Sequence, residues 1–249
     1  MPLLFSNGFA YQQNSDKAAN YPSTVLIHGA GSSHLGWPFA IRHLPTQNIL
    51  AIDLPNHGSS APKELHSIEE YAQDIYSFLK ALQLKKVNLI GYSMGSAMVL
   101  QLLLTYPFFC EKAVLMAYAP GVSLPASNFQ TLSEEDCLES FSKKLFFPNF
   151  PEALQSKLLE SSFGKDKTIL KKDLLLTSQY RPTFPREKCT VPTLFIFGKD
   201  DPFIDPEQKS ILTEHFSNAT IHEINHAGHL FIWQETTLVK GQLLQFLVP

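Results

Sequence analysis

Cysteine is scarce in this chain of 249 residues, and its three cysteines (Cys110, Cys137 and Cys189) lie far apart in the sequence. An odd number of cysteines without close spacing argues against a disulfide framework and against a zinc site. His28, His57, His226 and His229 show no His-x-x-x-His spacing among themselves. We therefore expect free thiols in a reducing cytosol, and no metal ion.

A surplus of positive charge is also missing, because the formal net charge at pH 7 is −3. A nucleic-acid-binding protein needs cationic side chains to neutralise phosphates, so this function class is excluded. No glycine-rich loop ends in Gly-Lys-Ser/Thr, and no Gly-x-Gly-x-x-Gly motif occurs. We expect no nucleotide and no other cofactor.

Long hydrophobic runs are absent, since the longest spans residues 97–104 and is too short to cross a bilayer. A basic-then-apolar leader is missing too, because Asn7, Gln12 and Asp16 interrupt the first residues. We expect no membrane span, no signal peptide and a cytoplasmic protein.

The hydrophobic content of 44% is sufficient for one large core. Short apolar strands alternate with amphipathic helical stretches, which predicts an α/β fold with a mostly parallel sheet and helices on both faces. A hairpin is expected over residues 3–12, and Ser67 with Glu70 has the spacing of a helix capping box. Further strands are expected at 24–27, 48–54, 87–90, 113–117, 193–197 and 220–224, and further helices at 206–216 and 231–247.

Residues 121–188 break this alternation. The segment contains many phenylalanines and prolines at helical spacing, and it is too long for a plain loop. We interpret it as a helical cap inserted into a core formed by residues 1–120 and 189–249. Most of these phenylalanines should form the cap's own core, whereas Phe129, Phe146 and Phe147 are candidates for lining a substrate pocket.

The most informative motif is Gly-Tyr-Ser-Met-Gly at residues 91–95. An apolar strand precedes it and an apolar helix follows, so Ser93 lies at the corner of a strand–turn–helix unit. Such a corner strains the backbone and projects the serine hydroxyl from the sheet edge. The flanking glycines allow strand and helix to approach closely. This context predicts a nucleophilic serine.

Serine needs a base within hydrogen-bond reach, and the base needs an acid to orient it. In this strand order both partners should follow the serine, each just after a strand. The acid candidates are Asp200 and Asp201, and the base candidates are His226 and His229.

At these motifs the chain resembles the α/β-hydrolase superfamily, in particular its compact bacterial-esterase-like branch, over nearly its whole length. The resemblance implies that Ser93 is the nucleophile, that Asp201 is the acid in the Gly-x-x-Asp motif, and that His229 is the base in the terminal Gly-His motif. It leaves Asp200 and His226 as loop residues near the site.

Acyl transfer also requires donors for a tetrahedral oxyanion. The Met94 amide, at the start of the helix, is one candidate. The resemblance implies that the second donor is the Ala30 amide, with the Gly31 amide as the alternative. Tyr92 and Gly31 are expected to border the pocket.

Three other positions bear on the resemblance. His28 and His57 are interpreted as scaffolding residues. Gln234 stands five residues after the expected base, where the family often has glutamate. This departure affects the local hydrogen bonding rather than the proposed triad.

These observations predict a cofactor-free serine hydrolase that cleaves a carboxylic ester with an apolar acyl or alcohol group. The alternatives left open are a pimeloyl-carrier-protein methyl esterase of biotin synthesis, a C–C bond hydrolase of ring-cleavage products, a thioester or lactone hydrolase, and a slow hydrolase that acts as a ligand sensor or signalling partner. Basic side chains of the cap are candidate contacts for an acidic carrier protein, although nearby acidic side chains reduce the positive charge of this patch. These basic contacts are Lys143, Lys144, Lys171, Lys172 and Arg181. The oligomeric state stays open.

Overall fold

A computed structural model describes residues 2–15, 22–45, 47–118, 130–146, 150–159 and 166–248. In this part of the chain an eight-stranded sheet has the order β1-β2-β4-β3-β5-β6-β7-β8. The strands are β1 (Leu3–Ser6), β2 (Phe9–Ser15), β3 (Ser23–Ile27), β4 (Asn48–Ile52), β5 (Val87–Tyr92), β6 (Cys110–Met116), β7 (Thr193–Gly198) and β8 (Ala219–Ile224). β1 and β2 pair antiparallel with their neighbours, and the pairs from β4 to β8 are parallel. The predicted mostly parallel sheet is confirmed.

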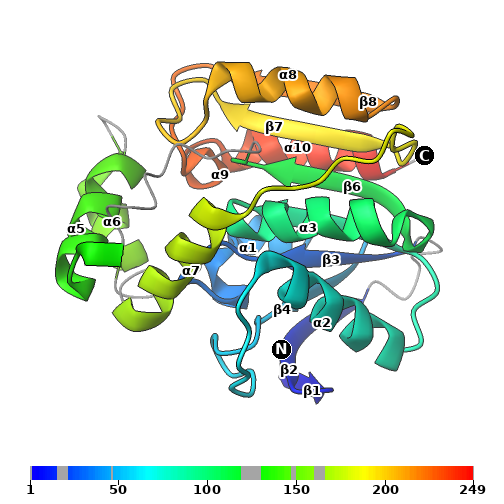
Figure 1. Cartoon of the computed structure of the whole chain (residues 1–249), viewed down its shortest axis with the longest axis horizontal. Helices are drawn as coiled ribbons and strands as arrows, with labels where there is room; N and C mark the ends of the chain where they lie inside the picture. Colours follow the sequence, from blue (N-terminus) through cyan, green and yellow to red (C-terminus); the bar gives the residue numbers. More distant parts are fainter. Residues whose placement is uncertain are drawn as a thin grey trace.

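The central strands are apolar because helices cover both faces of the sheet. Every residue of β3, β5 and β7 is buried. Helices α2 (Ile68–Ala81) and α3 (Met94–Thr105) pack together on one face, and α1 (Phe39–Arg42) packs against α10 (Thr236–Leu247) on the other (Figure 1). Among the described residues outside 130–179, the further helices are α8 (Pro206–His215), α9 (Phe231–Gln234) and the short 3-10 turns η1 (His34–Gly36) and η2 (Pro107–Phe109).

Three helices lie beyond the end of the sheet toward which the arrow of β7 points (Figure 1). These are α5 (Glu134–Leu145), α6 (Glu152–Leu158) and α7 (Lys167–Gln179), and all three come between β6 and β7 in the chain. α7 contacts both α5 and α3. The helical character expected here is confirmed for the described residues, and the division into a core and a cap domain stays a prediction. No helix in the described ranges is both long and apolar enough to cross a membrane.

The local structure differs from the sequence-based expectation at two helix ends. Ser67 caps α2 as expected, but the Glu70 side chain accepts the amide of His66 (2.7 Å) instead of that of Ser67. The helix expected over 231–247 breaks into α9 and α10 at Glu235. The Thr236 hydroxyl donates to the Ile232 carbonyl (2.7 Å), a side-chain bond of the kind that bends helices.

Candidate active site

Ser93 lies between the end of β5 and the start of α3, at the corner that the sequence predicts. Its backbone is left-handed, with φ 53° and ψ −118°, a conformation that costs a serine free energy. The amide of Ser93 donates to the Met116 carbonyl on β6 (2.8 Å). The neighbouring strand thus holds the strained corner in place.

The two glycines of the motif, Gly91 and Gly95, allow two different close contacts between backbone segments. A Cβ on Gly91 would lie 2.4 Å from the carbonyl oxygen of Gly95, so this glycine lets β5 and α3 approach, as expected. A Cβ on Gly95 would lie 2.1 Å from the carbonyl oxygen of Ile27. Gly95 therefore allows α3 to lie close to the backbone of the adjacent strand β3, rather than to that of β5.

The structure brings Ser93, His229 and Asp201 into one chain of contacts. His229 Nε2 lies 3.0 Å from Ser93 Oγ, and His229 Nδ1 lies 2.8 Å from Asp201 Oδ2. Both Asp201 and His229 are buried. The two rival candidates have other roles: the amide of Asp200 donates to the Ala227 carbonyl, and His226 is an exposed turn residue with φ 56°.

The hydrogen-bond partners of Asp201 and His229 indicate where the proton of the His229 ring lies. Asp201 Oδ1 accepts the amide of Phe203 (2.9 Å), which fixes the carboxylate. Because an ionised carboxylate can only accept, His229 Nδ1 carries a hydrogen. In the neutral form of the ring the Nε2 lone pair then faces Ser93 Oγ and accepts the Ser93 hydroxyl, the arrangement that activates a serine nucleophile.

Packing fixes the ring of His229. The ring of Phe203 meets it edge-on at 4.7 Å between centroids, and the ring of Tyr92 lies 5.9 Å away. The Tyr92 hydroxyl donates to the carbonyl of His229. Gln234 accepts the amide of Gly228 through its side-chain oxygen (3.3 Å), so the residue that departs from the family pattern supports the loop of the histidine.

Two small cavities, each of about 10 Å³, adjoin Ser93, and both are lined by Ala30 and His229. Of the predicted oxyanion donors, Ala30 lines both cavities, and Met94 directly follows Ser93 as the first residue of α3. Ala30 belongs to the loop of residues 28–33, here named the Ala30 loop. In the described part of the chain neither amide donates to a protein acceptor. The Gly31 amide, in contrast, donates to Asp173 Oδ2 (2.7 Å) and is not free.

The remaining pocket predictions have mixed outcomes. Tyr92 lines one of the two cavities. Gly31 and Phe146 line neither, and Phe146 packs instead on Phe150. Phe129 and Phe147 lie outside the described residues.

Sequence reasoning missed most of the side chains that line the cavities. The missed lining residues are mainly apolar: Ala117, Phe141, Leu145, Leu174, Thr177, Phe203 and Leu230. Two of them had a readable signal. Phe203 follows the acid by two residues, and Phe141 lies between Cys137 and Leu145 on the buried face of α5. A cavity of about 10 Å³ has room for about one water molecule, so the site is closed around Ser93.

Comparison with known proteins agrees with this fold. A family model described as the alpha/beta hydrolase fold matches residues 22–184. The chain belongs to the α/β-hydrolase fold family.

The similar proteins are named for different activities. A 2-hydroxy-6-oxononadienedioate/2-hydroxy-6-oxononatrienedioate hydrolase of Pseudomonas sp is 25% identical over 90% of this chain and 87% of that protein. An sn-1-specific diacylglycerol lipase of Mus musculus is 26% identical over 86% of this chain and 77% of that protein. The crystal structure of an enol-lactonase from Burkholderia xenovorans LB400 matches with a TM-score of 0.85 at 21% identity, and the match covers 100% of both chains.

A second group of buried histidines and acids supports the Ala30 loop of this α/β-hydrolase. His28 Nδ1 donates to the Gly29 carbonyl (2.8 Å), and His28 Nε2 accepts the Leu54 amide (3.1 Å), so the ring is neutral. Burial, followed by the nearby charge of His57, lowers the pKa of His28 to about 4. The interpretation of His28 as a scaffolding residue agrees with these contacts.

Asp53 anchors the neighbouring turn. Its carboxylate accepts the His34 amide (2.7 Å) and the Ser59 amide (2.9 Å), and it faces His34 Nδ1 at 2.8 Å. Burial alone raises the pKa of Asp53, but these hydrogen bonds outweigh it and lower the pKa overall. Among the described residues no cluster of three or more His, Cys, Asp or Glu side chains is placed to hold a metal ion.

Proposed function

We propose that this α/β-hydrolase is a serine esterase, which cleaves carboxylic esters through an acyl-enzyme intermediate on Ser93. The observation that carries the proposal is the continuous contact from Ser93 Oγ to His229 Nε2 (3.0 Å) and from His229 Nδ1 to Asp201 (2.8 Å). The strained backbone at Ser93 adds support, and so do the nearby amides of Ala30 and Met94, which donate to no protein acceptor in the described part of the chain.

In the proposed reaction His229 Nε2 takes the Ser93 hydroxyl proton while Oγ bonds to the ester carbonyl carbon. The amides of Ala30 and Met94 stabilise the resulting oxyanion, and Asp201 stabilises the imidazolium. His229 then gives its proton to the leaving alkoxide, and the alcohol departs as the C–O bond breaks. Water next loses a proton to His229, attacks the acyl carbon and releases the carboxylic acid, with the proton returned to Ser93 Oγ.

The lining of the cavities favours an ester with an apolar acyl or alcohol group. Side chains of Phe141, Leu145, Leu174 and Phe203 adjoin Ser93, and among the described lining residues there is no lysine or arginine. The mouse relative named as a diacylglycerol lipase acts on such an ester.

C–C bond hydrolysis is the second candidate, because the Pseudomonas relative is named as a hydrolase of a dioate. A dioate carries two carboxylates, and a site that binds them needs cationic partners. The absence of lysine and arginine from the described lining of the cavities therefore favours the ester.

A carrier-protein-bound substrate has less support. Lys143 pairs with Glu139 (2.6 Å), Lys171 donates to the Leu132 carbonyl (2.6 Å), and Arg181 donates to nearby carbonyls of its own segment. These cations are thus already engaged within the chain, so we propose a free small-molecule ester as substrate.

The proposal is tested by a chain-length series of p-nitrophenyl esters with wild-type protein, Ser93→Ala and the matched control Ser77→Ala. Ser77 is an exposed residue of α2 whose hydroxyl only bonds the Gln73 carbonyl. We expect Ser93→Ala to lower kcat by a factor on the order of 10⁴ or more, because it removes the nucleophile, with Tm nearly unchanged. Ser77→Ala should retain wild-type turnover.

Turnover by Ser93→Ala close to that of Ser77→Ala would overturn the proposal. If the wild-type protein instead cleaves 2-hydroxy-6-oxononadienedioate faster than every ester in the series, it is a C–C bond hydrolase.

A further inference from the structure

Helix α7 contacts the Ala30 loop through one buried carboxylate. Asp173 Oδ2 accepts the amide of Gly31 (2.7 Å) and lies 2.7 Å from Nε2 of His57, a residue of the turn after β4. The side chains of Asp173 and His57 are each only 1% exposed. Three segments that are distant in the sequence therefore meet at a single oxygen atom.

The partners of His57 determine its protonation. Nδ1 lies 2.9 Å from the Pro55 carbonyl, which can only accept, so Nδ1 carries a hydrogen. Nε2 faces a carboxylate oxygen that already accepts the Gly31 amide. An ionised carboxylate also only accepts, so Nε2 carries a hydrogen as well, and His57 is an imidazolium paired with Asp173.

The surroundings agree with this ion pair. Burial lowers the pKa of His57, but the charge and hydrogen bond of Asp173, with smaller contributions from the Pro55 carbonyl and Asp53, outweigh burial and raise the pKa overall. The third ring nearby is that of His28, 5.0 Å away, which is neutral. On the other side of Asp173, burial and then the charge of this carboxylate raise the pKa of Tyr71 to about 12.

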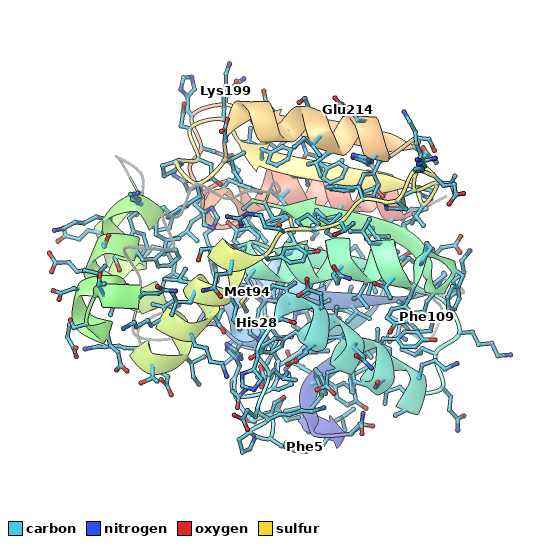
Figure 2. All side chains as sticks on the ribbon, viewed as in Figure 1. Phe5, His28, Met94, Phe109, Lys199 and Glu214 are labelled. Carbon is cyan, nitrogen blue, oxygen red and sulfur yellow. The ribbon has the colours of Figure 1, made fainter. Side chains whose placement is uncertain are left out.

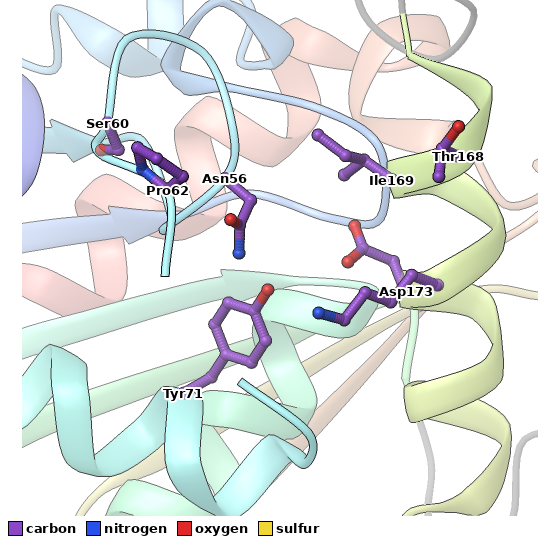
Figure 3. A pocket seen from close by; sticks show the side chains of 8 residues that line it. Asn56, Ser60, Pro62, Tyr71, Thr168, Ile169 and Asp173 are labelled. Carbon is purple, nitrogen blue, oxygen red and sulfur yellow. The ribbon is translucent and has the colours of Figure 1, made fainter. Parts of the chain in front are cut away.

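The second carboxylate oxygen has no protein donor among the described residues. Asp173 lines a cavity of about 300 Å³, where it faces Tyr71 from α2 and Asn56 from the turn after β4 (Figure 3). Lys172 lines the same cavity, and His57 is the cationic group within hydrogen-bond distance of Asp173 (2.7 Å).

The same face of α7 also packs on the Ala30 loop and lines the cavities at Ser93. Gly31 has φ +61°, and a Cβ there would lie 2.9 Å from Cδ1 of Leu170, so the loop lies directly against the helix. Leu174 and Thr177, which follow Asp173 on α7, line a cavity beside Ser93. A shift of α7 would therefore move the Ala30 loop and the cavity wall together.

We propose that Asp173 is a positioning residue for the oxyanion loop: its carboxylate holds the Gly31 amide and a doubly protonated His57, and thereby fixes the adjacent Ala30 amide relative to Ser93. This inference rests on the proposed esterase function. Asp173 touches no reacting atom in this scheme, and it acts through the peptide group that joins Ala30 to Gly31.

The test compares Asp173→Asn with the matched control Asp166→Asn. Asparagine keeps the shape of the side chain and one acceptor for Gly31, but it lacks the charge that retains the second proton of His57. Asp166 is an exposed residue that caps α7 by accepting the Ile169 amide, a role that asparagine performs equally well. Active sites are counted by covalent labelling with a fluorophosphonate, so that misfolded protein does not lower the apparent kcat.

We expect Asp173→Asn to lower kcat per labelled site about ten- to a hundredfold with little change in KM, because a misplaced oxyanion donor affects the transition state more than substrate binding. Asp166→Asn should match the wild type. In ¹⁵N NMR spectra at pH 7.5, His57 should show two protonated ring nitrogens in the wild type and one in Asp173→Asn.

A kcat per site within twofold of wild type in Asp173→Asn would overturn this inference alone. A neutral His57 in the wild-type spectrum would also overturn this inference, because Asp173 would then hold the Gly31 amide but not a doubly protonated His57. Absence of turnover in the wild-type protein on every ester would overturn the proposed function, and the role of the loop with it.

Discussion

His28 and His57 lie ring to ring, 5.0 Å apart, yet their hydrogen-bond partners give them different charge states, one neutral and one cationic. His28 accepts an amide at Nε2 and is neutral, whereas His57 faces acceptors at both nitrogens. Burial next to an imidazolium lowers the pKa of His28 to about 4, below the ordinary value of 6.5. The two histidines therefore affect stability in different ranges of pH.

We expect His28 to make the fold sensitive to acid. A pKa that is lower in the folded state means that the unfolded chain binds a proton first as the pH falls below 6.5. Stability should then decrease between pH 6.5 and about 4, by up to about 3 kcal/mol from this group. The raised pKa of His57 acts elsewhere, because its contribution is complete below pH 6.5 and is lost as the pH rises through that pKa.

Urea unfolding at several pH values checks this expectation with wild type and His28→Gln. Glutamine does not titrate, so the variant should be less stable at pH 7 but should lose stability less steeply from pH 6.5 to 4. Parallel slopes for the two proteins would show that another group causes the acid sensitivity.

Ser93 was predictable from its strand–turn–helix context, whereas the topology left two candidates each for the acid and the base. The family resemblance then selected Asp201 and His229. The Asp173–His57 contact had no such signal, since it joins a helix and a turn 116 residues apart and depends on how α7 packs. The same reason explains why Leu174 and Thr177 of α7 were not predicted to line the site.

At the scale of elements, the corner between β5 and α3 depends on backbone atoms that nearly touch. The prediction is that Gly95→Ala destabilises the protein by more than about 3 kcal/mol, because its Cβ would lie 2.1 Å from the Ile27 carbonyl oxygen and would force β3 and α3 apart. Thermal unfolding measures the loss, which should appear as a markedly lower Tm or as insoluble protein.

Gly241→Ala is the matched control for this substitution. Gly241 is exposed within α10, and a Cβ there meets no atom within 4 Å. Alanine is the better helix former, so this variant should be more stable by about 0.5–1 kcal/mol. Equal effects of the two substitutions would contradict the close approach of α3 to β3.

The elements themselves were largely predictable. Strands buried on both faces read as continuous apolar runs, and Asn7-Gly8, both with positive φ, form the turn of the expected hairpin. The break at Glu235 was not predictable, because residues 231–247 keep a helical apolar pattern while the Thr236 hydroxyl competes for a backbone carbonyl.

At the scale of the molecule, the parallel strands bring four loops to one edge of the sheet. The loops after β3, β5, β7 and β8 carry Ala30, Ser93, Asp201 and His229, and helices α5 and α7 lie beyond the same edge (Figure 1; side chains in Figure 2). Their side chains Phe141 and Leu174 close the cavity over Ser93. The sheet places the reacting groups, and the helices beyond it limit what reaches them.

The small space around Ser93 also bears on the chemistry. Room for about one water molecule suits the hydrolysis of an acyl-enzyme, but an ester does not fit into it. Substrate binding therefore requires the side chains that line the cavity, such as Phe141 and Leu174, to make room.

The measurement that tests the central claim most directly is mass spectrometry of the protein mixed with p-nitrophenyl butyrate and quenched in acid. We expect a butyryl adduct on the peptide that contains Ser93, formed in the burst of p-nitrophenol release and lost as turnover proceeds. An adduct on another residue, or sustained turnover with no adduct on Ser93 at any time, would contradict the account.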